Sequence, residues 1–253
     1  MPVARLLLLT LLACLGLAAR AEPLRIVSEP WAPYVYEEHG EIRGLDYEAS
    51  AEVFRRLGVE VEWSLQPWKR CLMELESGQA DGVLDIFHTD ERESWMVYPA
   101  EPLSKVEFVL FHDRQRPYPF NRLDDLRGLK VGVSPGYWYA DPQFRTSPLF
   151  TREAAPTHEA NLGKLVRDRV DLVVNDRLAG RFLIHKMGLA RKVGEHARVI
   201  SRDRLYLSFR RTPELERLAG RFSAELLRFK QEPAYAQLKS RYQATAASLD
   251  GNR

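Results

Sequence analysis

The stretch "DGVLDIFHTDER", residues 81 to 92, places Asp85 inside an apolar run and Arg92 in the turn after it. An apolar run of this length is typical of a buried strand, and polar groups that follow a strand lie where open α/β sheets bind ligands. The Arg92 guanidinium is a planar fork of donors that can hold a carboxylate. Alternatively, it pairs on the surface with Glu91 or Glu93. The turn is therefore a candidate ligand site.

Large aromatic residues recur in segments that are predicted to face the same cleft. Trp31 and Tyr34 follow the first predicted strand, Trp68 begins a predicted helix, and Tyr137 and Trp138 follow a turn of the second half of the chain. Their rings offer faces to a cation or to a flat ligand. The alternative is inward packing, the more common fate of an aromatic side chain. We expect Trp31, Tyr34, Trp68 and at least one of the later rings to line the cleft.

The elements that must position these residues form a repeating pattern of strands and helices. Alternation of this kind predicts an α/β fold with a largely parallel sheet and helices on both faces. The pattern predicts strands at 24–29, 59–65 and 81–87, and helices at 45–58 and 67–78.

A second run of α/β elements lies inside the first. One strand leads into it near residues 106–112 and another leads out near 204–210, so two lobes joined by two crossing hinge strands are predicted. The cleft between such lobes is the default ligand site. The predicted organisation is a signal peptide at 1–21, lobe 1 at 22–112, lobe 2 at 113–205, and the rest of lobe 1 with the C-terminal helices at 206–253.

The N-terminus predicts export. "MPVARLLLLTLLACLGLAARA" has one Arg before a short apolar run and ends in Ala19-Arg20-Ala21, a small-x-small pattern of a secretory cleavage site. We expect a periplasmic protein that begins at Glu22. A lipoprotein attached through Cys14 is the less favoured alternative.

Charge and cysteine content exclude several classes of function. The chain has 37 Lys+Arg and 35 Asp+Glu, and removal of Arg5 and Arg20 with the leader leaves 35 of each, so no nucleic-acid partner is indicated. Cys71 would then be the single remaining cysteine, without a disulfide partner. The histidines show no paired spacing for a metal, and "GVSPG" lacks the Lys and hydroxyl pattern of a phosphate loop, so no metal and no cofactor are predicted.

Three segments together resemble one known family: "WAPYVYEEHGEIRGLDYEASAEVFRRLG" with the sequence that follows it to "YPAEPL", "LDDLRGLKVGVSPGYWY", and "LVRDRVDLVVNDRLAG". They are similar to the extracellular solute-binding proteins of family 3, which serve polar amino-acid uptake. The resemblance covers nearly all of the chain after the leader. It implies a two-lobed type II periplasmic-binding-protein fold, a small-molecule ligand, and as partner the membrane permease of an ABC transporter or a sensor receptor. A monomer is the usual state in that family.

The resemblance also implies roles for two residues. In the family, the Arg of a "T-x-x-R" turn binds the α-carboxylate of the ligand, and Thr89 to Arg92 match that turn. An Asp at the end of a strand that reads like "DLVVND" holds the ligand's ammonium, and Asp176 matches it. The alternative for Asp176 is a helix N-cap, and one carboxylate can serve both purposes.

The chain departs from the family beside this Arg. Members that bind simple amino acids have small residues there, whereas this sequence has Asp85, Phe87 and His88. An acid at this place repels a carboxylate, so Asp85 either attracts a cationic group of the ligand or is neutralised by Lys69, Arg70 or His88.

Two functions are consistent with these residues. The first is a binding protein, not an enzyme, that closes on an amino-acid-like or cationic ligand for uptake or sensing. The alternative is a periplasmic dehydratase-like enzyme on the same fold, which needs a general acid such as Asp85 or His88. No spacing in the chain identifies such an acid together with its supporting groups.

Overall fold

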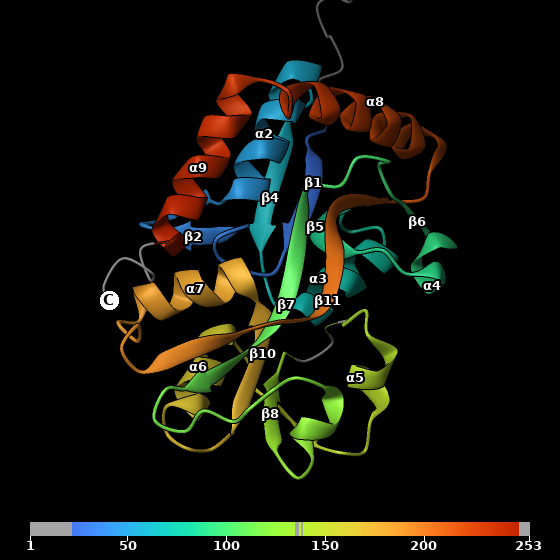
Figure 1. Cartoon of the computed structure of the whole chain (residues 1–253). Helices are drawn as coiled ribbons and strands as arrows, with labels where there is room; N and C mark the ends of the chain where they lie inside the picture. The colour runs from blue at the N-terminus through green and yellow to red at the C-terminus, as the bar shows by residue number, and fades with distance from the viewer. Residues whose placement is uncertain (1–21, 135–136, 138, 248–253) are drawn as a thin grey trace, which may run out of the picture.

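The computed structural model describes residues 22–134, 137 and 139–247, which are drawn in colour in Figure 1. The predicted signal peptide at 1–21 and the predicted ligand residue Trp138 lie outside the described residues.

One mixed sheet runs through the whole molecule. Its strand order is β4-β1-β5-β11-β7-β10-β8-β9, with β6 also paired to β11. The strands are β1 (Leu24–Ser28), β4 (Val61–Leu65), β5 (Gly82–Phe87), β6 (Met96–Val97), β7 (Ser104–Asp113), β8 (Lys130–Val133), β9 (Thr151–Ala154), β10 (Leu172–Asp176) and β11 (Val193–Arg210). The strands β4, β1 and β5 are parallel to one another, as are β10, β8 and β9. Antiparallel pairing occurs where β7 and β11 join these two groups.

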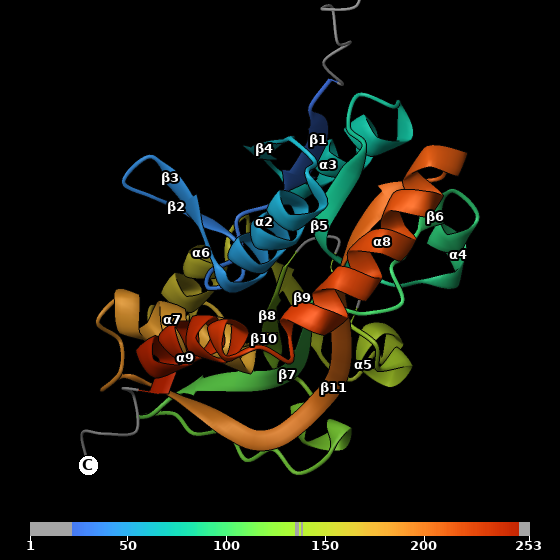
Figure 2. The ribbon, with the colours of Figure 1, turned by 90° about the horizontal axis from the view of Figure 1, so that it is seen from above.

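Helices cover each group of parallel strands and make two lobes, the upper and lower halves of Figure 1. The upper lobe carries α2 (Leu45–Leu57), α3 (Trp68–Glu76), α4 (Asp90–Glu93) and α8 (Pro213–Phe229), and the lower lobe carries the 3-10 helix η1 (Leu123–Leu126), α5 (Pro142–Thr146), α6 (His158–Leu165) and α7 (Arg177–Lys186). A small hairpin of β2 (Tyr36–Glu38) and β3 (Glu41–Arg43) stands apart from the sheet. The last helix, α9 (Pro233–Ala247), contacts both α7 and α2, and Figure 2 shows it beside α7.

Two long strands connect the lobes, as the sequence predicts. β7 pairs with β10 in the lower lobe, and the end of β11 pairs with β5 in the upper lobe. β11 is much longer than the predicted strand at 204–210 because it pairs with β7 from Val193 onward. Register shifts near residues 195–201 let this long strand bend between the lobes.

The apolar face of α2 shows how the upper lobe is held together. Ala49, Val53 and Phe54 are buried on one side of the helix, and Phe54 packs 5.1 Å from Phe222 of α8 between ring centroids. The helix ends at Gly58, whose φ of 66° lies in the left-handed region that glycine adopts without steric cost.

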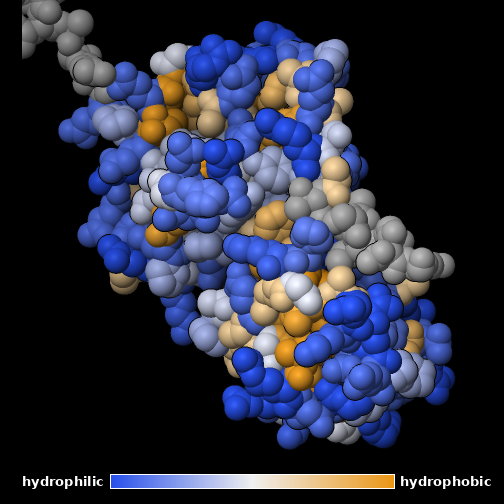
Figure 3. Space-filling model, turned by 90° about the vertical axis from the view of Figure 1, so that its left-hand side faces the viewer, coloured by the Kyte–Doolittle hydropathy of each residue, from blue (hydrophilic) through white to orange (hydrophobic). Residues whose placement is uncertain are grey.

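The surface in Figure 3 is mostly hydrophilic, with hydrophobic side chains in separate patches. Within the described parts of the chain, no helix has the length and apolar character that crossing a membrane requires.

Candidate functional site

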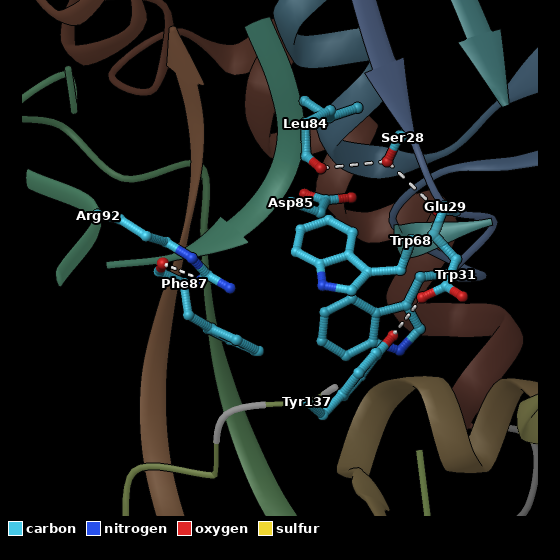
Figure 4. Close-up of a pocket in the computed structure, with 9 residues that line it drawn as sticks. All are labelled: Ser28, Glu29, Trp31, Trp68, Leu84, Asp85, Phe87, Arg92 and Tyr137. Atoms are coloured by element: carbon cyan, nitrogen blue, oxygen red, sulfur yellow. Dashed lines mark hydrogen bonds between the residues drawn. The ribbon is translucent and has the colours of Figure 1, made fainter. Parts of the chain in front are cut away.

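Residues of β1 and β5 and of the segments that follow β1, β4, β5 and β8 meet in a small chamber between the lobes (Figure 4). Its lining residues are Ser28, Glu29, Trp31, Trp68, Leu84, Asp85, Phe87, Arg92 and Tyr137. The cavity volume is about 20 Å³, room for one water molecule. Five of the predicted ligand residues, Trp31, Trp68, Asp85, Arg92 and Tyr137, are therefore brought together by the fold.

Arg92 points into this chamber from the short helix α4. The Thr89 side chain caps α4 by accepting a hydrogen bond from the Arg92 backbone N–H at 3.4 Å. The Arg92 Nη1 atom donates to the Phe87 carbonyl oxygen at 3.0 Å, and the guanidinium carbon lies 5.9 Å from the ring centroid of Trp68. The guanidinium is thus held by the carbonyl group at the end of β5 and by the Trp68 ring, in a position to bind an anionic group.

A β-bulge in β5 positions Asp85. Tyr206 of β11 lies opposite Ile86 and Ser208 lies opposite Val83, so two residues of β5 face one residue of β11. Asp85 is one of these two and has a φ of 61°, which is uncommon for a residue other than glycine. Bulges re-aim side chains next to functional sites, and here the side chain of Asp85 turns to the chamber.

Asp85 has a second buried acid as its neighbour, Asp46 in the first turn of α2. The Ser104 hydroxyl donates to Asp46 Oδ1 at 2.5 Å, whereas neither carboxylate oxygen of Asp85 accepts a hydrogen bond from a donor of the described side chains and backbone. Burial raises the pKa of Asp46 to about 6, and burial together with the charge of Asp46 raises the pKa of Asp85 well above its usual range.

The cations that the sequence offers to Asp85 lie elsewhere. Arg70 Nε contacts Glu74 Oε1 at 2.8 Å on the outer face of α3, and Lys69 beside it is exposed. His88 Nε2 lies 2.6 Å from Glu93 Oε1. The neighbour of Asp85 is instead an acid that sequence spacing does not indicate, because Asp46 lies in α2, far from Asp85 along the chain.

Tyr137 of the lower lobe reaches across to Glu29 of the upper lobe. The Tyr137 hydroxyl donates to Glu29 Oε2 at 3.5 Å and lies 2.9 Å from His158 Nε2, and His158 Nδ1 lies 3.2 Å from the Ser134 hydroxyl. A neutral His158 with its proton on Nε2 satisfies all three contacts. Burial lowers the pKa of His158 to about 4, so its contacts are made by the neutral imidazole, and burial also raises the pKa of Glu29.

A larger cleft of about 510 Å³ lies next to the chamber and shares Glu29 and Tyr137 with it. Its walls come from both lobes and include Pro30, Tyr36, Gln66, Ser134, Thr157, His158, Glu159 and Lys186. The contact between Glu29 and Tyr137 therefore lies at the boundary between the small chamber and the larger cleft.

Tyr34 and Asp176 lie outside the chamber lining and contact each other. The Tyr34 hydroxyl donates to Asp176 Oδ2 at 2.8 Å, and both residues are buried. Asp176 also caps α7 by accepting from the Ala179 N–H at 2.9 Å, and its Oδ1 accepts from the Glu107 N–H at 3.0 Å. The N-cap role is therefore present, and the ammonium-binding role remains a prediction.

Within the described residues, no group of three or more His, Cys, Asp and Glu side chains is arranged to hold a metal ion. Cys71 is buried, and burial raises its thiol pKa to about 12, which disfavours the reactive thiolate.

Two α/β lobes joined by two crossing strands, with a chamber between them, define the class of type II periplasmic binding proteins. The sequence model described as "Bacterial extracellular solute-binding proteins, family 3" matches residues 24–245. The chain belongs to this family, as the resemblance in its sequence implies.

Three similar proteins illustrate the family and the fold. A probable amino-acid-binding protein of Bacillus subtilis (strain 168), YxeM, is 26% identical over 165 residues, which are 64% of this chain and 61% of that protein. The sensor domain of a histidine kinase with similarity to periplasmic binding proteins has a TM-score of 0.76 at 22% identity and covers 87% of this chain and 96% of its own. An amino acid ABC transporter substrate-binding protein of Streptococcus pneumoniae, AbpA, bound to L-arginine, has a TM-score of 0.76 at 18% identity and covers 88% and 95%. At these identities the two solved structures show the fold.

Proposed function

We propose that the protein captures a small amino-acid-like ligand with an additional positive charge in the chamber between its lobes. The observation that carries this proposal is that a basic side chain, Arg92, and an acidic side chain, Asp85, both line the chamber. Arg92 offers donors to a carboxylate, and Asp85 is a buried acid without a hydrogen-bond donor of its own. A zwitterionic or cationic amino acid has groups for both.

The aromatic lining supports the same ligand class. Trp31, Phe87 and Tyr137 form edge-to-face pairs around the chamber, with ring centroids 5.3 to 6.5 Å apart. The Trp68 ring lies below Asp85 in the view of Figure 4, and its centroid is 5.9 Å from the guanidinium carbon of Arg92. Ring faces attract cations and flat groups, so these side chains favour an ammonium or guanidinium group over a plain aliphatic one.

The proposal also covers the processing, location and partners of the protein. The mature chain begins at Glu22 after export and cleavage, and works as a periplasmic monomer with lobes divided at residues 112 and 205. It delivers its ligand to the permease of an ABC transporter or presents it to a sensor receptor. The sequence and fold are compatible with either partner, and the relatives include both an ABC transporter component and a kinase sensor domain.

The dehydratase-like alternative has one supporting observation. Catalysis of that kind needs a general acid, and burial together with the charge of Asp46 raises the pKa of Asp85, a carboxyl group that lines the chamber. The experiment on binding therefore also follows whether the ligand is consumed.

The test is a thermal-shift screen of the chain from Glu22 with amino acids, polyamines and aromatic carboxylic acids. A ligand at 100 times its dissociation constant stabilises the native state by about 2.7 kcal/mol. We expect hits among basic amino acids, recovered unchanged by mass spectrometry, and their loss in Arg92→Ala. The matched control is Arg55→Ala, because Arg55 is an exposed arginine paired with Glu52 on the outer face of α2.

Two results would contradict the proposal. Hits that Arg92→Ala binds as well as the wild type would remove Arg92 as the anchor. Hits that are converted to product would favour the enzyme, and Asp85 would become the first residue to replace.

A further inference from the structure

Asp46 and Asp85 are neighbouring buried acids that interact with each other, and Asp85 lines the chamber. Asp46 is 1% exposed and Asp85 is 6% exposed. Asp46 Oδ2 and both oxygens of Asp85 have no hydrogen-bond partner among the described residues when both groups are ionised. Two neighbouring carboxylates out of contact with water cannot both carry a charge without a large cost, so the pair shares its protons.

The charged and titratable groups around the pair do not neutralise it. Three ionisable groups interact with Asp46: Lys230 after α8, Tyr235 of α9 and Asp176 of β10. Two others, Tyr34 and Tyr137, interact with Asp85. Glu29 and Arg92 are the other ionisable groups that line the chamber. Lys230 is the cation that acts on Asp46, and its Nζ already contacts Glu101 Oε1 at 2.7 Å and the Pro102 carbonyl.

We propose that the empty chamber keeps a proton on Asp85, hydrogen-bonded to Asp46, and that a positively charged group of the ligand displaces this proton. The inference rests on the proposed function, since it takes the chamber to be the ligand site. The O–H bond of the Asp85 carboxyl breaks, the proton passes to solvent, and the resulting carboxylate binds the cation.

The geometry assigns the proton to Asp85 rather than to Asp46. Asp46 is stabilised as an anion by the hydrogen bond from Ser104, whereas Asp85 receives no donor in the described structure. Asp85 also lines the chamber, which Asp46 does not, so an incoming cation meets Asp85 first. The exchange replaces one positive charge by another, and the net charge buried in the protein stays the same. A neutral ligand cannot make this exchange.

A second side chain of the chamber also lacks a partner. Trp31 is 3% exposed, and its Nε1–H makes no hydrogen bond within the described structure. A buried donor without an acceptor is uncommon in native proteins. Together, the donor of Trp31 and the acid of Asp85 indicate a ligand that carries both an acceptor and a positive group.

The first test needs no ligand. It is a carbon NMR measurement on the purified protein with 13C-labelled aspartate carboxyls. The signal of Asp85 is assigned as the one that is absent from the spectrum of Asp85→Asn. In the wild type at pH 6, this signal should have the chemical shift of a protonated acid. Asn tolerates the left-handed conformation of residue 85, so this variant is expected to fold. Asp168→Asn is the matched control, because Asp168 has a φ of 57° and its side chain is 72% exposed. An Asp85 signal that is already ionised at pH 5 would overturn the proposal.

The second test uses ammonium chloride, whose cation is about the size of a water molecule. Relative to sodium chloride at the same concentration, ammonium should raise the Tm of the wild type and of Asp168→Asn, but not that of Asp85→Asn. Because one proton leaves, the affinity for ammonium should increase about tenfold for each unit by which the pH is raised, as long as the pH stays below the pKa of the pair. Equal shifts in all three proteins, or no dependence on pH, would overturn the exchange.

A third measurement on the wild type needs no variant. Ammonium added to unbuffered protein should release about one proton per site, and release of none would overturn the proposal. The two proposals can fail separately. If basic amino acids bind but Asp85 is ionised when the chamber is empty, the proposed function stands and the exchange is wrong. If ammonium releases the proton but no amino acid binds, the exchange stands and the ligand class is wrong.

Discussion

The hydroxyl of Tyr34 makes a buried hydrogen bond between the lobes, and its removal should weaken the protein. Tyr34→Phe takes one of three donors from Asp176, and a buried hydrogen bond to a charged group contributes about 1.5–3 kcal/mol. We expect the free energy of unfolding to fall by about 1–2 kcal/mol in urea denaturation, because two backbone donors remain.

The matched control for this variant is Tyr118→Phe. Tyr118 also donates to an aspartate, Asp171 Oδ1 at 2.9 Å, but this pair is only partly buried. Its loss should cost a few tenths of a kcal/mol. Equal losses in the two variants would show that the Tyr34 bond contributes nothing through its burial between the lobes.

The buried imidazole of His158 should titrate far below an ordinary histidine. Its pKa is lowered to about 4 by burial, so the unfolded chain binds a proton that the folded chain does not between pH 6.5 and 4. Stability contributed by neutral His158 is complete above pH 6.5 and is lost as the pH falls toward 4. Ring-proton NMR, assigned with His158→Gln, should show a midpoint near pH 4. A midpoint near 6.5 would contradict the buried, neutral imidazole.

At the scale of residues, the sequence located the chamber but not its electrostatics. Arg92 and Trp31 were predicted because each follows a strand, and Asp85 because it lies near the end of one; such positions share one edge of a sheet. Asp46 and His158 were not found, since an acid in the first turn of a helix and a lone histidine are ordinary surface residues in a sequence. Their burial depends on how α2 and α6 pack, which spacing along the chain does not contain.

Among the elements, the start of α2 depends on a glycine that the loop after β1 approaches closely. A Cβ at Gly44 would lie 2.1 Å from the Tyr34 carbonyl oxygen, and the φ of Gly44 is 133°. Gly44→Ala should therefore lose at least about 2 kcal/mol of unfolding free energy, from strain and overpacking together. Gly58→Ala is the control, because Gly58 has a φ of 66° with open space around it and should lose about 1 kcal/mol. Equal losses would mean that the approach of Tyr34 is not tight.

Elements with strong periodicity were predictable, and irregular ones were not. The apolar stripe and terminal glycine of α2 and the apolar run of β5 matched the structure within a few residues. The bulge at Asp85 was not predicted, because a bulge depends on how β5 pairs with β11 and not on the sequence of β5 alone. The first half of β11 was also missed, since its burial is mixed and its strand form comes from pairing with β7.

For the whole molecule, the proposed binding of an amino acid in the chamber requires that the lobes move. A cavity of about 20 Å³ holds a single water, and an amino acid is many times larger. The bonds that join the lobes here, from Tyr34 to Asp176 and from Tyr137 to Glu29, must therefore adjust or break before a ligand enters. A hinge of two strands permits such a motion, and the ligand favours the closed state through contacts that only this state provides.

This leads to an expectation for the size of the protein in solution. Small-angle X-ray scattering of the empty wild type should give a radius of gyration above the value calculated from residues 22–247 of this structure, and a ligand from the screen should reduce it. Arg92→Ala should stay expanded when the same ligand is added, because the anchor that favours closure is absent. Tyr34→Phe should expand the empty protein further, since it removes a bond between the lobes. Identical scattering from the empty and the ligand-bound wild type would contradict closure, and the ligand would then have to enter by side-chain movement alone.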